Sequence, residues 1–428
     1  MRGEIIAIGD ELTSGRILNS TSNFAARHLF AAGHDIIAMH TIGDEMDMIG
    51  DTLRTSVQRA DFIVVTGGLG ATTDDLTNEA VAASFDLPVT FHPEIFAKFN
   101  FGGRKEAVSP MPANSETKDK TGIGKADNNL EKLAWLPQGA ELLKPEGNMA
   151  GYVLVQDSKP IFFLPGVPHE MKELLAEKVI PRLAAMGGMT TLAVKHKLFK
   201  LLGVGETVIN EKLRSIEQKD GRVRIGYYPV FPEVHVSLTV RDAEQERAEQ
   251  LFAEHDSLIT AALEEYIFAC DGDTMEAVVG QLLLQQNKTL ATAESCTGGL
   301  ISHAITRVSG SSNYFAGGVV AYSNDLKEGL LGVRHETLMQ YGAVSEQVAR
   351  EMAAGIRHKT GADIGVSVTG IAGPTGGTEE KPVGTVYFGL ATPTETKVFV
   401  YHFKGDRWKI QHQTSHTALD LVRRALLA

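Results

Sequence analysis

The sequence predicts an α/β protein with more than one domain. At 428 residues it exceeds the size at which one hydrophobic core keeps growing. Toward both ends of the chain, short apolar runs alternate with amphipathic helical stretches, a pattern typical of a parallel sheet wrapped by helices. From about 190 to 262 the pattern changes to longer strands followed by one helix, which indicates a small α+β unit in the middle.

The first 170 residues alternate strands with helices. Apolar runs predict strands at 4–9, 35–41 and 61–66. Helices are expected at 19–32, where Asn19 and Ser20 form the start, and at 45–59. The polar, lysine-rich stretch 102–129 contains two prolines and is expected to form a long surface insertion. Strands at 152–156 and 160–164 and a helix near 169–186 complete this part.

The middle unit and the last third follow. Strands are expected at 190–200, 222–228 and 233–241, with a helix at 243–263. Cys270–Asp273 is a candidate linker, and Asp273 with Glu276 is predicted to cap the next helix. Strands are then predicted at 289–294, 317–322, 363–369, 384–391 and 396–403, with a hairpin turn at 392–395, and helices at 297–308, 345–360 and 406–427.

Composition narrows the classes of partner. Lys and Arg number 41 and Asp and Glu 53, so the net charge of −12 argues against a surface that coats nucleic acid or an anionic membrane. Only Cys270 and Cys296 are present, without metal-ligand or disulfide spacing, as expected in a reducing compartment. From the apolar pattern we expect neither a signal segment nor a membrane-spanning run. We therefore expect a cytoplasmic protein with small polar or anionic ligands, no membrane partner and no direct nucleic-acid partner.

The candidate chemistry of the last third centres on Ser295, which ends a predicted strand and precedes a helix. Free amides at a helix start could receive a developing oxyanion. Lys327 could act as the base if burial or a nearby cation lowers its pKa, and Thr369 could relay the proton or orient the lysine. These side chains together predict an acyl-transfer site without histidine.

Each of these residues also has an ordinary structural interpretation. Ser295 could be an N-cap, Lys327 a solvated surface group and Thr369 a packing residue. The neighbouring Cys296 is intrinsically the better nucleophile, and Glu294 or Asp325 are alternative bases.

Glycine-rich turns and one arginine suggest an anion site. Gly370–Gly377 follows a strand and could direct amides toward a phosphate, although a plain tight turn fits equally well. Arg407 opens the last helix and could clamp a phosphate or simply be solvated.

A family resemblance covers residues 270–428. It rests on the motifs 293–299, 322–324, 342–345, 369–374 and 381–386, which closely resemble the nicotinamide mononucleotide amidohydrolases that form the C-terminal domain of CinA-type competence/damage-inducible proteins. The resemblance implies hydrolysis of the carboxamide of nicotinamide mononucleotide to the acid and ammonia, without a cofactor. It implies Ser295 as nucleophile, Lys327 as base and Thr369 as auxiliary hydroxyl. Candidate substrate-binding residues are Tyr322, Gly298, Gly299, Gly370, Gly373 and Arg407.

Near the N-terminus, polar and glycine-rich turns follow two predicted strands, at 9–12 and 66–77. The carboxyl ends of parallel strands form the ligand crevice of an open sheet. Gly67, Gly68 and Gly70 would let backbone approach a phosphate. The carboxylates that could hold a divalent cation are Asp10, Asp74 and Asp75, although the latter two also suit a helix start.

This region, about 1–170, resembles the molybdopterin-binding fold of molybdenum-cofactor biosynthesis proteins, in the version that begins CinA-type proteins. The match rests on 9–12, 67–77 and 164–170. It implies metal-dependent ADP-ribose pyrophosphatase activity with a divalent cation of unassigned identity, and K⁺ as a further candidate cation. Thr73 stands where the family pattern has histidine, and the 102–130 insertion replaces a short connection.

The middle unit, 171–263, resembles the small KH-like module of the same proteins. Its loop 203–206 lacks flanking basic residues, so RNA binding is not expected. A spacer or a dimer contact is the better interpretation, and we expect a homodimer.

Three hypotheses follow for the whole chain. It is a two-headed enzyme of pyridine-nucleotide salvage acting on nicotinamide mononucleotide and ADP-ribose. Alternatively, its N-terminal half is a non-catalytic pterin or nucleotide binder, or the protein is an interaction factor in DNA uptake or repair with little catalysis.

Overall fold

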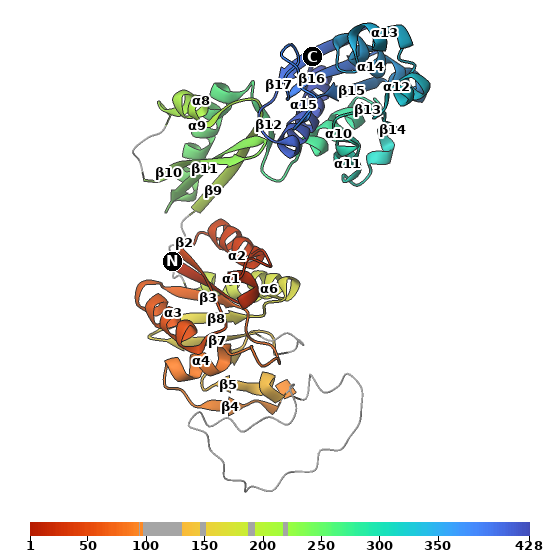
Figure 1. The fold of residues 1–428 in the computed structure, drawn as a ribbon. Coiled ribbons are helices and arrows are strands. Elements are labelled where there is room, and N and C mark those ends of the chain that lie inside the picture. Colours follow the sequence, from red (N-terminus) through yellow and green to blue (C-terminus); the bar gives the residue numbers. More distant parts are fainter. Residues whose placement is uncertain (94, 97–130, 146–150, 187–192, 217–220) are drawn as a thin grey trace. The chain divides into compact units, whose positions relative to one another are not determined.

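The computed structural model describes residues 1–428 except 94, 97–130, 146–150, 187–192 and 217–220 (Figure 1). The chain divides into two compact units, Met1–Val194 with Arg241–Ala248, and Lys195–Val240 with Glu249–Ala428. The predicted insertion at 102–129 lies outside the described residues.

The N-terminal unit contains a six-stranded sheet in the order β2-β1-β3-β8-β7-β6. Alternate residues of its strands face two hydrophobic cores, one on each side of the sheet. Four strands are parallel: β1 (Arg2–Ile8), β2 (Asp35–Ile42), β3 (Phe62–Thr66) and β8 (Lys159–Leu164). Helices α2 (Ser20–Ala31) and α6 (Pro168–Leu174) pack on one face, and α3 (Met46–Arg59) and α4 (Thr77–Ser84) on the other (Figure 1).

The sheet is parallel as predicted except at one edge. Strand β7 (Tyr152–Gln156) runs antiparallel to β8, and β6 (Glu141–Leu142) antiparallel to β7. The two residues between β7 and β8, Asp157 and Ser158, have φ of 50° and 62°. So short a connection can only reverse the chain, because a parallel pair needs a crossover of about a dozen residues.

Smaller elements complete this unit. They are α1 (Asp10–Thr13), the ribbon of β4 (Val89–Phe91) and β5 (Trp135–Pro137), the short helix η1 (Glu131–Ala134), the π-helical turn η2 (Leu175–Val179) and α7 (Ile180–Met186).

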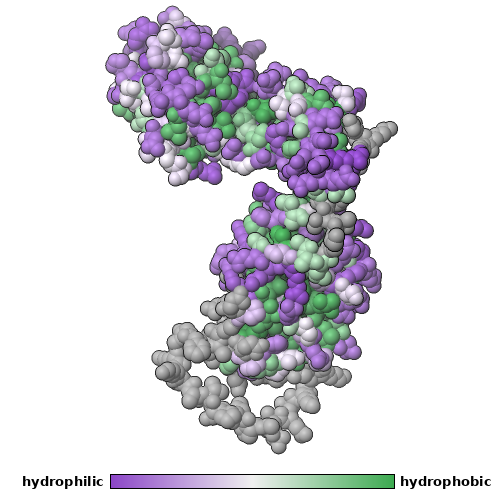
Figure 2. Space-filling model, turned by 180° about the vertical axis from the view of Figure 1, so that it is seen from behind, coloured by the Kyte–Doolittle hydropathy of each residue, from purple (hydrophilic) through white to green (hydrophobic). Residues whose placement is uncertain are grey.

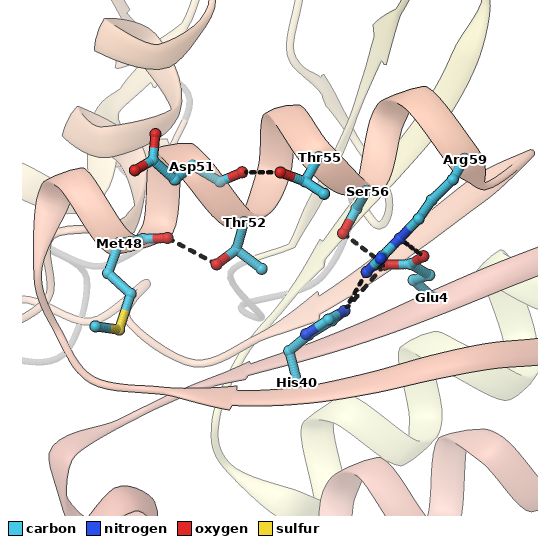
Figure 3. Close-up of polar contacts among 8 residues, drawn as sticks. All are labelled: Glu4, His40, Met48, Asp51, Thr52, Thr55, Ser56 and Arg59. Carbon is cyan, nitrogen blue, oxygen red and sulfur yellow. Dashed lines mark hydrogen bonds and ion pairs between the residues drawn. The ribbon is translucent and has the colours of Figure 1, made fainter.

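A buried carboxylate fastens α3 to the sheet (Figure 3). Glu4 of β1 is fully buried, and its carboxylate accepts hydrogen bonds from Ser56 Oγ at 2.7 Å and Arg59 Nη2 at 3.0 Å, with His40 Nε2 also at 3.0 Å. Burial raises the pKa of Glu4, but the hydrogen bonds from Arg59, Ser56 and His40 outweigh it, so the pKa lies below its usual range. The group is therefore structural, and it lies near the amino end of β1.

The middle module has a four-stranded sheet in the order β10-β11-β9-β12. The three predicted strands and the long helix are confirmed, whereas α8 and β12 were not predicted. Strand β12 has only four residues and includes Cys270, which the sequence assigned to a linker. The elements are β9 (Ala193–Leu201), α8 (Glu206–Leu213), β10 (Val223–Val230), β11 (Glu233–Asp242), α9 (Gln245–Leu263) and β12 (Ile267–Cys270).

The C-terminal part has a five-stranded sheet in the order β14-β13-β15-β16-β17. Three strands are parallel, and β16 and β17 are antiparallel to their neighbours. The strands are β13 (Leu290–Glu294), β14 (Phe315–Val320), β15 (Ile364–Gly370), β16 (Thr385–Ala391) and β17 (Thr396–His402). The predicted turn between β16 and β17 is confirmed, since Thr392 N donates to Glu395 O at 2.8 Å.

Helices cover both faces of this sheet (Figure 1). One core includes α10 (Met275–Gln285), α11 (Leu300–Thr306) and α15 (Arg407–Leu427), and the other includes α12 (Asn324–Leu331), α13 (His335–Tyr341) and α14 (Glu346–Thr360). The predicted cap of α10 is off by one residue, because Thr274 Oγ1, not Asp273, accepts from Ala277 N. The short helices α12 and α13 were not predicted.

Hydrophilic residues dominate the face of the molecule seen in Figure 2. Within the described part of the chain, none of the helices combines the length and hydrophobicity needed to cross a membrane.

Candidate active site

Ser295 is the first residue after β13 and is 8 % exposed. Its amide donates to the Val368 carbonyl of β15 at 3.1 Å, which fixes the residue at the carboxyl end of two parallel strands. The chain then turns through Gly298 and Gly299, whose φ values of 63° and 101° strain any residue with a Cβ. Helix α11 consequently begins at Leu300, not at 297 as predicted.

Lys327 lies against this serine. The Ser323 hydroxyl caps α12 by accepting from Leu326 N at 3.2 Å, and Lys327 follows on the buried face with 1 % exposure. Its Nζ lies 3.2 Å from Ser295 Oγ and donates to the Ala321 carbonyl at 2.8 Å, with the Tyr322 carbonyl at 3.5 Å. The predicted pair of hydroxyl and amine is therefore assembled from segments 32 residues apart.

Burial lowers the pKa of Lys327. No carboxylate forms an ion pair with this amine among the residues that the structure describes. Desolvation without a compensating anion favours the neutral amine, which is the form that can accept a proton from a serine hydroxyl.

Two alternatives from the sequence lose support here. Burial raises the pKa of the Cys296 thiol to about 12, so the thiolate that would compete with Ser295 is scarce at neutral pH. Asp325 is exposed in the first turn of α12, on the side of the helix away from Lys327.

Glu294, the last residue of β13, binds the amides at the start of α11, whose N-cap is Gly299. Its fully buried carboxylate accepts from the amides of Gly299, Ile301 and Ser302 and from the hydroxyls of Thr297 and Ser302, at 2.6 to 3.1 Å. A carboxylate engaged by five donors is not placed to serve as the base. The expectation that free amides of this helix receive the oxyanion is also wrong, because Glu294 occupies them.

Thr369 is buried on β15, and its hydroxyl donates to the Ala343 carbonyl at 2.7 Å. No hydrogen bond joins it to Ser295 or Lys327 among the described residues. In this arrangement its contact holds the loop before α14 instead of the lysine.

The mouth of the site joins three residues singled out as substrate contacts. Arg407 Nη2 donates to the Tyr322 hydroxyl at 3.1 Å, and its Nη1 donates to the Gly373 carbonyl at 3.0 Å. Tyr322 is 61 % exposed and Gly370 ends β15. The site therefore has the buried Lys327 amine at its inner end and the Arg407 guanidinium with the exposed Tyr322 at its surface.

Sequence reasoning missed Gln411, whose Nε2 donates to the Cys296 carbonyl at 2.7 Å. It lies one helical turn after Arg407, so its side chain shares that face of α15. The four-residue spacing from Arg407 was the feature of the sequence that could have pointed to Gln411.

The N-terminal unit has a separate cleft of about 490 Å³ at the carboxyl ends of its parallel strands. Gly67, Gly68 and Gly70 line it, as do Asp74 and Asp75. Gly67 has a φ of 100°, and a Cβ there would lie 2.2 Å from the Ile8 carbonyl oxygen, so only glycine fits.

Acidic side chains cluster in this cleft in a different set from the predicted one. Asp10 is not among the lining residues; its Oδ1 accepts from Asp44 N at 3.2 Å. Glu11 and Asp44 line the cleft. Burial raises the pKa of Asp44, and the charges of Asp10, Glu11 and Asp74 raise it further.

The predicted metal ligands do not form a metal site as they lie. Asp75 Oδ2 accepts from Thr72 N at 2.9 Å. Across the described residues, no three or more His, Cys, Asp or Glu side chains are arranged to hold a metal ion.

The fold and the site define an α/β protein with a buried serine–lysine pair in its last domain and a glycine-lined cleft of about 490 Å³ in its first. Three family models match the chain: the CinA C-terminal domain over 272–426, the probable molybdopterin binding domain over 4–185 and the damage-inducible protein CinA KH domain over 196–269. The chain belongs to the CinA family.

Full-length relatives agree with this assignment. The CinA-like protein of Desulfotalea psychrophila is 48 % identical over 424 residues, covering 99 % of this chain and 98 % of its own. The putative competence-damage inducible protein of Moorella thermoacetica is 39 % identical over 432 residues, covering 100 % and 99 %. Among solved structures, competence damage-inducible protein A of Klebsiella pneumoniae is 36 % identical, covers 36 % of this chain and 95 % of its own, and has a TM-score of 0.35.

Proposed function

We propose that the C-terminal domain is a nicotinamide mononucleotide amidase that releases ammonia and nicotinic acid mononucleotide. The observation that carries the proposal is the 3.2 Å contact between Ser295 Oγ and the buried Lys327 Nζ. A neutral amine has two hydrogens and one lone pair. The carbonyls of Ala321 and Tyr322 take the two hydrogens, which leaves the lone pair for the Ser295 hydroxyl.

The reaction follows from this arrangement. Ser295 Oγ attacks the carboxamide carbon while its proton passes to Lys327 Nζ. The C–N bond of the tetrahedral intermediate then breaks, and Lys327 returns the proton to the leaving nitrogen, which departs as ammonia. Water next attacks the acyl-serine and gives a proton to Lys327. Lys327 passes this proton to Ser295 Oγ as the ester bond breaks, which releases the acid and restores the neutral amine.

The rim suits a mononucleotide. Arg407 uses two of its N–H groups on Tyr322 and Gly373, so others remain to pair with a phosphate. The exposed ring of Tyr322 could stack on the pyridinium ring, which is a cation. Both contacts would hold the carboxamide over Ser295.

Ammonia release from nicotinamide mononucleotide by the purified chain tests the proposal. Ser295→Ala should abolish it, with trapping of an acyl-enzyme on Ser295 as the direct readout. A chain that acts only as an interaction factor in competence or DNA damage would release no ammonia.

For the N-terminal domain we propose nucleotide binding, with ADP-ribose hydrolysis as the candidate reaction. The glycine turn that lines the cleft supports a phosphate contact. Binding of ADP-ribose and release of AMP should be measured with and without added divalent cation. Binding without AMP release would identify a binding module, and no binding would refute both.

A further inference from the structure

We propose that Gln411 is a positioning residue of the amidase, which aims the Thr297 amide at the oxyanion formed when Ser295 attacks. The inference rests on the proposed function of the C-terminal domain. It concerns the turn 295–299 and a helix that reaches it from more than 100 residues later in the chain.

The turn needs an oxyanion donor that is not in α11. The amides of Gly299, Ile301 and Ser302 are held by the Glu294 carboxylate. The Leu300 amide donates to the Thr297 carbonyl at 3.3 Å, and the Gly298 amide donates to the Ser295 carbonyl at 3.2 Å. Within the described residues, no oxygen accepts a hydrogen bond from the amides of Cys296 and Thr297, and the Thr297 amide belongs to the peptide that Gln411 contacts. An amide beside a nucleophile that is left without an acceptor is placed to stabilise developing negative charge.

Gln411 fixes the direction of that amide. The Cys296 carbonyl and the Thr297 N–H belong to one planar trans peptide, so they point in opposite directions. Gln411 Nε2 donates to the Cys296 carbonyl at 2.7 Å from α15. Holding the carbonyl toward α15 therefore keeps the N–H turned away from α15 and prevents the peptide from rotating.

The same helix carries Arg407 one turn earlier, so Gln411 and Arg407 lie on one face of α15. Arg407 reaches the rim of the site and Gln411 reaches the turn behind the nucleophile. This face of α15 would therefore act on the phosphate of a bound substrate through Arg407 and on its carboxamide through Gln411.

The test uses the full chain with Gln411→Met, which removes the donor, and Gln411→Glu, which keeps the shape but cannot donate. Gln286→Met is the matched control, because Gln286 Nε2 donates to the Leu426 carbonyl at the other end of α15. In the Gln411 variants we expect kcat for nicotinamide mononucleotide to fall about tenfold to one hundredfold. This decrease does not exceed the one caused by removing an oxyanion donor completely, which is about 10²–10³. KM should change less than about twofold, and Gln286→Met should match the wild type in both constants.

A second readout does not depend on the substrate. In labelling by a fluorophosphonate, Ser295 Oγ bonds to phosphorus, fluoride leaves and Lys327 takes the serine proton, while the phosphoryl oxygen needs the same donor. Labelling of the Gln411 variants should slow by about the factor seen in kcat, and labelling of Gln286→Met should not. Equal labelling rates in all variants, or a loss of activity carried by KM alone, would overturn the proposal. Normal labelling of a wild type that leaves nicotinamide mononucleotide intact would refute the substrate assignment, while the relative labelling rates would still decide the role of Gln411.

Discussion

Replacement of Lys327 by arginine or methionine should stop catalysis, and the methionine variant should stay folded. Arginine keeps the positive charge but is not deprotonated in proteins, and methionine keeps the length without the amine. Neither can accept the Ser295 proton. We expect both variants to fail to a similar extent.

The size of the effect follows from the contacts. A positioned general base contributes about 10²–10⁴ in rate, or about 3–5 kcal/mol in the activation free energy. In Lys327→Met the carbonyls of Ala321 and Tyr322 lose their donor, at about 1 kcal/mol each, while the cost of burying an amine disappears. The unfolding free energy should therefore change by less than about 2 kcal/mol, too little to explain the loss of activity.

The assay is ammonia release over a range of pH, with thermal unfolding measured in parallel. Because burial lowers the pKa of Lys327, the wild-type kcat/KM should rise with pH and level off below the ordinary lysine pKa of about 10.4. Lys381→Met is the control, since Lys381 also donates to two backbone carbonyls, those of Tyr341 and Val344. Near-normal turnover of Lys327→Arg would refute the assignment and require another base.

Three further predictions concern other parts of the chain. Cys296→Ala should keep most of the ammonia release, and iodoacetamide should alkylate Cys296 slowly at pH 7, because burial raises its pKa to about 12; rapid inactivation by the reagent would count against Ser295. Glu4→Gln should lower the unfolding free energy by about 1–3 kcal/mol at pH 7. That difference should fade as pH falls through the lowered Glu4 pKa, since protonation then removes the same charge from the wild type; a constant difference at all pH values would contradict this. The fragment 270–428 should release ammonia with or without a chelator, although losing the Phe231–Trp408 ring contact (5.7 Å) should lower its melting temperature; a chelator-sensitive fragment would exclude a metal-free mechanism.

The sequence alone was sufficient for the fold class, most of the long elements and the motifs that identify the CinA family. Long strands and helices can be predicted because burial of one face makes apolar residues recur with the period of that element. It failed for the shortest elements, such as β12 and α12, whose few residues form stable structure only against a sheet or core already in place. The antiparallel edge at β7 was also missed, although the two-residue turn before β8 was a readable signal.

The chemistry of the site was decided by tertiary structure. Sequence could propose Ser295, Cys296 and Lys327 as candidates, but their roles depend on contacts between distant segments. The donors that hold Glu294 are local, since all of them lie within eight residues of it. Folding buries Lys327 without a carboxylate, buries the Cys296 thiol and places five donors around Glu294. Desolvation and hydrogen bonding set which group ionises, and the desolvation of Lys327 and Cys296 comes from the packing of distant segments around them.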